Sequence, residues 1–151
     1  MSDELKLSGL WNDAYDSDKK AWFESVVELI RTRLHTIKDF STTGRPYFAD
    51  DFTFDELAVQ KNLKKDPNLK GYLLQLADLF ADHAAFNIET AEQAVRELSE
   101  KLGIKAGIII NGVRTAVTGQ ASGPGLFELL IAIGRERVVT RLRTAAQQFC
   151  A

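Results

Sequence analysis

The chain of 151 residues has a single cysteine, Cys150, and no long run of apolar residues. One cysteine cannot form a disulfide within the chain, and this count is compatible with a reducing cytosol. A membrane-spanning helix needs about 20 consecutive apolar residues, and no stretch of this sequence approaches that length. The first ten residues, MSDELKLSGL, lack the apolar segment of a signal peptide. We therefore expect a cytoplasmic protein that does not enter a membrane.

Histidine is also scarce, with only His35 and His83 in the chain. Neither has a second histidine or a cysteine at the spacing of metal ligands, so we predict no metal site. Three aspartates, Asp50, Asp51 and Asp55, lie close together but lack the glycine and the distal glutamate of a calcium-binding loop. We interpret them as a solvated loop that contains a helix N-cap.

Basic residues are unevenly distributed, although the net charge is only −2. Residues 1–100 contain 12 lysines and arginines against 19 acidic residues, a balance of −7, whereas residues 101–151 contain 7 against 2, a balance of +5. Attraction for phosphate rises with local positive charge, so a nucleic-acid surface is expected in the C-terminal part. The alternative is an ordinary solvated face of a terminal amphipathic helix, formed by Arg135, Arg137, Arg141 and Arg143.

Apolar residues recur at helical spacing along most of the chain. This periodicity predicts helices over residues 18–34, 55–63, 68–83 and 90–103. We expect Ser17 to cap the first of these helices, and Thr90 with Gln93 to form a capping box at the start of the last one. No internal repeat or low-complexity segment is visible.

The segment from Gly112 to Gly134 places an arginine and a Gly-Pro-Gly turn between two strongly apolar stretches. Gly119 follows the first stretch, as a residue that can adopt positive φ at a helix end should. Pro124 precedes the second stretch, at the start of a predicted helix where its missing N–H is tolerated. The free N–H groups at such a helix start can donate hydrogen bonds to phosphates or to base edges, and the alternative is a helical corner without a ligand.

Two separated motifs give this chain a resemblance to a known family. The segment RTAVTG at 114–119 is followed by PGLFE at 124–128 and GRER at 134–137, and RTRLHTIKDF occupies 31–40. In this order and at about this separation, they resemble the C-terminal anticodon-binding region of glutamyl-tRNA synthetases. The resemblance extends over nearly the whole chain, from residue 22 to the end.

The resemblance assigns roles in RNA binding to five residues. Arg33 corresponds to a family arginine that reads the third anticodon nucleotide and helps to exclude glutamine tRNAs. Its planar fork of donors suits a cytosine edge and meets a mismatched pattern on guanine. Arg114 corresponds to an arginine that helps to hold the first anticodon nucleotide. Pro124, Gly125 and Leu126 correspond to a turn whose backbone carries anticodon contacts.

The resemblance also implies the fold and the partners. It implies an all-α fold of two small helical subdomains, residues 1–66 and 67–151, that form an anticodon-binding helical cage. Adenylation in the family requires a nucleotide-binding α/β domain, whose signatures do not occur in this sequence. We therefore expect no catalytic residue and no cofactor in this chain, with ATP and magnesium serving the N-terminal catalytic domain of a parent glutamate–tRNA ligase. The expected partners are that domain and the anticodon loop of glutamate tRNA, and Met1 is expected to be an added start residue.

One segment can be interpreted in two ways from local rules. Three consecutive isoleucines and the Asn111–Gly112 pair within residues 107–117 are typical of a β-hairpin. The family has a helix at this position, and we predict a helix here.

Two other functional hypotheses remain. A free-standing, non-catalytic paralogue would bind tRNA or a protein and would have an intact short reading frame. A plain helical interaction module would show no salt-dependent binding of tRNA.

Overall fold

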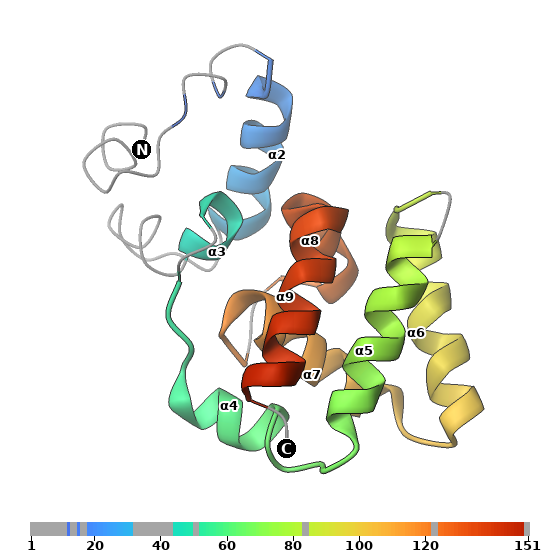
Figure 1. Cartoon of the computed structure of the whole chain (residues 1–151). Coiled ribbons are helices and arrows are strands. Elements are labelled where there is room, and N and C mark those ends of the chain that lie inside the picture. Colours follow the sequence, from blue (N-terminus) through green and yellow to red (C-terminus); the bar gives the residue numbers. More distant parts are fainter. Residues whose placement is uncertain are drawn as a thin grey trace. The chain divides into compact units, whose positions relative to one another are not determined.

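The structure of the chain is a computed structural model that describes residues 12, 15, 18–31, 44–49, 52–82, 85–121 and 124–149. Every regular element in these ranges is an α-helix, which confirms the predicted all-α fold (Figure 1). The chain divides into two compact units, residues 1–52 and 53–151. The predicted boundary between residues 66 and 67 falls within the second unit, at a connection between two helices, and that division stays a prediction.

The first unit contains an aromatic cluster beside its helices. These helices are α2 (Lys20–Ile30) and α3 (Arg45–Phe48). The ring of Tyr15 stacks on Phe23 with centroids 5.0 Å apart, and the rings of Trp22 and Phe48 are nearly perpendicular with centroids 6.2 Å apart. Such aromatic pairs add about 0.5–1.5 kcal/mol beyond the area they bury. The predicted cap at Ser17 and the predicted extension of α2 to residue 34 lie outside the described residues.

The second unit consists of six helices in its described part. They are α4 (Glu56–Asn62), α5 (Leu69–Asp82), α6 (Ile88–Leu102), α7 (Ala106–Thr118), α8 (Leu126–Ile133) and α9 (Arg135–Gln148). Helix α5 packs against α9, α6 and α7. The helices predicted over 55–63 and 68–83 correspond closely to α4 and α5. The N-cap expected in the loop of the three aspartates is provided by Asp55, whose carboxylate accepts a hydrogen bond from the N–H of Ala58 at 3.2 Å.

The core of the second unit follows the apolar spacing of α5. Leu69, Leu73, Leu76 and Phe80 are fully or almost fully buried, as the periodicity predicts. Leu79, three positions after Leu76 on the helix, is 37% exposed. Burial of each large apolar side chain contributes roughly 1.5–3 kcal/mol, so this one face accounts for much of the driving force that assembles the unit.

The N-cap of helix α6 lies three residues before the predicted one. Asn87 is the N-cap, and its side chain accepts the N–H of Thr90 at 2.9 Å. The hydroxyl of Thr90 in turn accepts the N–H of Asn87 at 3.0 Å, which completes a capping box. The predicted pair of Thr90 with Gln93 is therefore wrong, and Gln93 instead donates to Glu97. The predicted end at Gly103 is confirmed by its left-handed backbone.

Helix α7 is continuous through the segment for which local rules favoured a hairpin. It extends over residues 106–118, so the prediction of a helix is confirmed. Gly112 lies where α7 meets α5, and a Cβ there would be 2.9 Å from a methyl of Leu69. A glycine is costly in a helix interior, but here it permits close approach of two helices. Tertiary packing thus overrides the local Asn-Gly signal.

No helix in the part of the chain that the structure describes is both long enough and apolar enough to span a membrane.

Candidate functional site

The end of α7 and the start of α8 bring together four of the five predicted binding residues. Arg114 lies on α7, Pro124 precedes α8, Gly125 is the N-cap of α8 and Leu126 is its first residue. Pro124 and Leu126 are buried, whereas Gly125 is exposed. The accessible part of this turn is therefore backbone at Gly125. Arg33, the fifth residue, lies outside the described residues.

Gly119 ends α7 in a conformation and a space that suit only glycine. Its φ is +74°, and its N–H bonds back to the carbonyl of Thr115. Its carbonyl accepts the N–H of Asp55 at 2.8 Å, so the segment before α4 is tied to the turn. A Cβ on Gly119 would lie 2.5 Å from the carbonyl oxygen of Thr53. The positive φ and the close approach of the backbone segment before α4 both require a glycine at this position.

Arg114 spans the turn that leads to α8. Its Nη1 donates a hydrogen bond to the carbonyl oxygen of Pro124 at 2.5 Å. A charged donor strengthens such a bond, to about 1.5–3 kcal/mol in net terms. The residue as a whole is only partly buried. Arg114 therefore positions the backbone beside Gly125, in addition to presenting its charge at this surface.

Buried hydroxyl groups fix the first residues of the same turn. The hydroxyl of Thr118 donates to the carbonyl of Arg114 at 2.7 Å and accepts the N–H of Gln120 at 3.1 Å. The hydroxyl of Thr115 donates a hydrogen bond to the carbonyl of Gln120 at 3.3 Å and accepts one from Nδ2 of Asn62 at 3.0 Å. Both threonines are at most 4% exposed, and buried polar groups of this kind need partners. These positioning residues were missed, although two threonines within an apolar helical run are a usable signal.

Arg141 does not lie on the solvated basic face that the alternative interpretation of the C-terminal charge gave it. It is 7% exposed, and its Nη1 donates a hydrogen bond to the carbonyl of Val117 at 2.8 Å. This bond satisfies one of the last carbonyls of α7, which have no partner within the helix. Arg143 pairs with Asp78 at 3.0 Å, and Arg135 lies over the ring of Phe86. The basic residues of α9 therefore serve packing as well as surface charge.

The start of α8 carries an acidic side chain of its own. Glu128 is in the first turn, and a Cβ added to Gly125 would collide with its carboxylate. A carboxylate near a helix N-terminus is stabilised by the helix dipole and by the free N–H groups. It also repels a phosphate from this position. The exposed helix start is therefore better suited to base edges or sugar hydroxyls than to phosphate. Of the two ligands expected from the sequence at this helix start, phosphate and base edges, the structure favours base edges.

Within the described ranges, no three His, Cys, Asp or Glu side chains gather as they would around a metal ion.

Comparison with known proteins places this arrangement in a family. The family described as "Anticodon binding domain" matches residues 5–146. A glutamate–tRNA ligase of Desulfotalea psychrophila is 44% identical over 97% of this chain, and a glutamate–tRNA ligase 2 of Koribacter versatilis is 40% identical over 82% of it. This chain covers only 30% and 25% of those two proteins.

Solved structures share the fold. The crystal structure of a glutamate tRNA ligase from Elizabethkingia meningosepticum, in complex with its amino acid, has a TM-score of 0.72 and 23% identity. The match covers 82% of this chain and 24% of that one. A glutamate-tRNA synthetase from Elizabethkingia anophelis has a TM-score of 0.68 and 21% identity over 98% of this chain and 29% of its own. The resemblance inferred from the two sequence motifs is thus confirmed, and the chain belongs to the anticodon-binding-domain family.

Proposed function

We propose that this chain is the anticodon-recognising part of a glutamate–tRNA ligase and that it binds the anticodon loop of glutamate tRNA. The family match over residues 5–146 and the names of the most similar relatives support this proposal. A catalytic domain that uses ATP and magnesium would then belong to the parent protein, which would act in the cytoplasm. The chain would orient the tRNA so that its 3′ end meets that domain.

The observation that carries the proposal is the bond between Arg114 and the Pro124 carbonyl. Of the three turn residues, Gly125 is exposed, whereas Pro124 and Leu126 are buried. The bond from Arg114 fixes the backbone directly before Gly125. Splayed anticodon bases are recognised by donors and acceptors on their edges, and a rigid backbone presents such groups at low entropic cost. Arg114 also places positive charge at this surface, where it would attract the RNA backbone.

Arg33 is the residue to which we assign discrimination at the third anticodon nucleotide. This assignment comes from its place in the RTRLHTIKDF motif. Arginine offers donors only, so it pairs with the carbonyl and ring nitrogen of cytosine, whereas glutamine offers both a donor and an acceptor. Arg33→Gln should therefore relax rejection of an anticodon that ends in guanine.

Charging kinetics of the parent ligase test this assignment. We expect Arg33→Gln to alter the preference for cytosine over guanine by about 1–3 kcal/mol, while glutamate activation stays largely intact. Arg31→Gln is a matched control, because Arg31 is two positions away and makes an exposed ion pair with Glu28 that contributes little. Equal losses with both tRNAs for Arg33→Gln would assign Arg33 to the structure of the helix end instead.

A further inference from the structure

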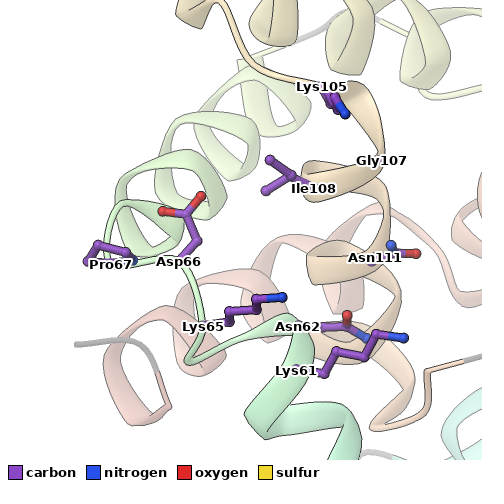
Figure 2. Close-up of a pocket in the computed structure, with 9 residues that line it drawn as sticks. All are labelled: Lys61, Asn62, Lys65, Asp66, Pro67, Lys105, Gly107, Ile108 and Asn111. Atoms are coloured by element: carbon purple, nitrogen blue, oxygen red, sulfur yellow. The ribbon is translucent and has the colours of Figure 1, made fainter.

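A pocket of about 550 Å³ opens at the other end of α7, between its first turns, the end of α4 and the α4–α5 connection (Figure 2). Its volume is within the ~300–1,000 Å³ that is typical of small-ligand sites. The lining residues include three lysines, two asparagines and one exposed isoleucine: Lys61, Lys65, Lys105, Asn62, Asn111 and Ile108. None of them belongs to the turn around Pro124.

The charge around this pocket is positive. Lys61, Lys65 and Lys105 are exposed, and none of them makes an ion pair with a carboxylate among the described residues. Asp66 is the one acid in the lining, and its Oδ1 accepts the N–H of Asn68 at 2.8 Å, just before α5. Three chain segments thus each contribute a lysine to the lining of one cavity. Lysine binds phosphate as a compact point charge.

The other lining groups suit more than a bare anion. Nδ2 of Asn62 donates a hydrogen bond to the hydroxyl of Thr115. This bond orients the side-chain amide of Asn62 and leaves its Oδ1 available as an acceptor. Asn111 is exposed on the next turns of α7 and offers both a donor and an acceptor. Ile108 is 37% exposed, and in Figure 2 its side chain points from α7 toward Asp66 across the opening. An apolar surface beside amide groups and ammonium charges fits a nucleoside joined to phosphate.

We propose that this pocket binds one nucleotide unit, with its phosphate held by Lys61, Lys65 and Lys105. The base or ribose lies against Ile108, within reach of Asn62 and Asn111. The proposal rests on the proposed function, because RNA is then the natural source of the nucleotide, and a free nucleotide is the other source of the same chemistry. The site binds the strand through its backbone and is separate from the turn that contacts the anticodon.

Gly107 offers a variant that blocks the pocket without endangering the fold. It is in the first turn of α7 and in the pocket wall, and a Cβ there would meet nothing within 4 Å. Gly107→Asp introduces a carboxylate that repels phosphate. An acid in the first turn is favourable to the helix, so the thermal midpoint should not fall. Gly71→Asp is the matched control, since Gly71 is exposed, has equally open space and lies in the first turn of α5 outside the pocket lining.

The experiment measures binding of the full chain to two RNA stem–loops, one with a glutamate anticodon and one with an unrelated anticodon. We expect Gly107→Asp to weaken both by about tenfold, and Gly71→Asp to weaken them by less than about twofold. The pocket proposal would be overturned if Gly107→Asp and Gly71→Asp bound RNA with the same affinity as each other, and likewise bound adenosine 5′-monophosphate with the same affinity as each other. Equal affinity of the unaltered chain for the two stem–loops would instead overturn the proposed function, so the two failures are distinguishable.

Adenosine 5′-monophosphate distinguishes RNA from free nucleotides as the source of the ligand, and a hexaglutamate peptide tests whether the site prefers an acidic protein. Adenosine 5′-monophosphate should shift the amide resonances of Gly107, Ile108 and Asn111 in a saturable way, and the stem–loops should compete with it. Binding of the mononucleotide without competition by RNA would support the nucleotide site and assign its ligand to the free pool. A hexaglutamate peptide that shifted the same resonances with the affinity of RNA would overturn the nucleotide assignment in favour of an acidic protein partner.

Discussion

The two ends of α7 are built in opposite ways. At the C-terminal end, the backbone of Thr53 fills the space beside Gly119, and buried hydroxyls and two arginines bond to carbonyl groups of the helix and the turn. At the N-terminal end, Gly107 has open space beside it, and three exposed lysines surround a cavity. The C-terminal end of α7 fixes the conformation of the backbone, whereas the N-terminal end has an open cavity lined by positive charges. The same residue type, glycine, therefore has different roles at the two ends.

The largest effect is expected where the C-terminal end is most constrained. Gly119→Ala must hold an alanine at φ near +74° with its Cβ against the Thr53 carbonyl. We expect the free energy of unfolding to fall by about 3 kcal/mol, from backbone strain and overpacking together. Urea denaturation measures this loss. Gly103→Ala is the control, since Gly103 has a φ of +66° but open space, and it should lose only about 1 kcal/mol. Equal losses would show that the contact with Thr53 contributes nothing.

A second test removes the side chain that spans the turn. Arg114→Ala should weaken RNA binding by about 1.5 kcal/mol, roughly tenfold, because the Pro124 carbonyl loses a charged donor and the surface loses a charge. Filter binding with glutamate tRNA measures the change, and no preference for a guanine-ending anticodon should arise. Arg143→Ala is a suitable control because its pair with Asp78 is exposed. Unchanged affinity for Arg114→Ala would separate the turn from RNA binding.

A smaller effect is expected at the open end of α7. Lys105→Gln should reduce the slope of log K against log salt by about 0.7–0.9, the contribution of one phosphate contact. Affinity measured at several salt concentrations gives this slope. Lys101→Gln provides the comparison, since Lys101 is exposed at the end of α6 and does not line the pocket. An identical slope change for both lysines would point to diffuse attraction and not to a phosphate contact.

The smallest effect concerns the acid at the start of α8. Glu128→Gln should cost about 0.3–1 kcal/mol of stability, because a charge that complements the helix dipole is lost. RNA affinity should rise slightly, since a repulsive charge beside Gly125 has gone. Thermal unfolding and binding measured on the same sample test both statements. Glu136→Gln changes an exposed acid in the first turn of α9, and it should leave RNA affinity nearly unchanged. A fall in affinity for Glu128→Gln would give this acid a direct role in binding.

Periodicity and motif spacing predicted most of the fold. The helices α4 and α5 and the left-handed ends at Gly103 and Gly119 follow from these patterns. The helical state of residues 107–117 was predicted from the family resemblance, against a local signal for a hairpin. The capping residue of α6 was placed three positions too late, because Asn87 and Thr90 form the box and Thr90 alone resembled its start. Apolar periodicity located these helices well, but neighbouring polar residues compete for the N-cap position.

The candidate site was predictable only in part. The motif indicated Arg114 and the turn, but the burial of Arg141 depends on how α9 packs against α7, which no local pattern encodes. The lysine pocket was also hidden, since Lys61 and Lys65 come from the acidic part of the sequence and Lys105 from the basic part. A charge balance over long segments averages away a cluster that only the fold assembles.

The hydrogen bond between Asp55 and Gly119 has a consequence for the order in which the chain assembles. These residues are 64 positions apart, so Asp55 is synthesised well before its partner exists. The bond forms only when the chain has closed a long loop, and non-local closures of this kind slow folding. The turn that carries Gly125 therefore cannot be completed on its own, and any fragment that begins after Asp55 will lack the segment that holds Gly119 in place.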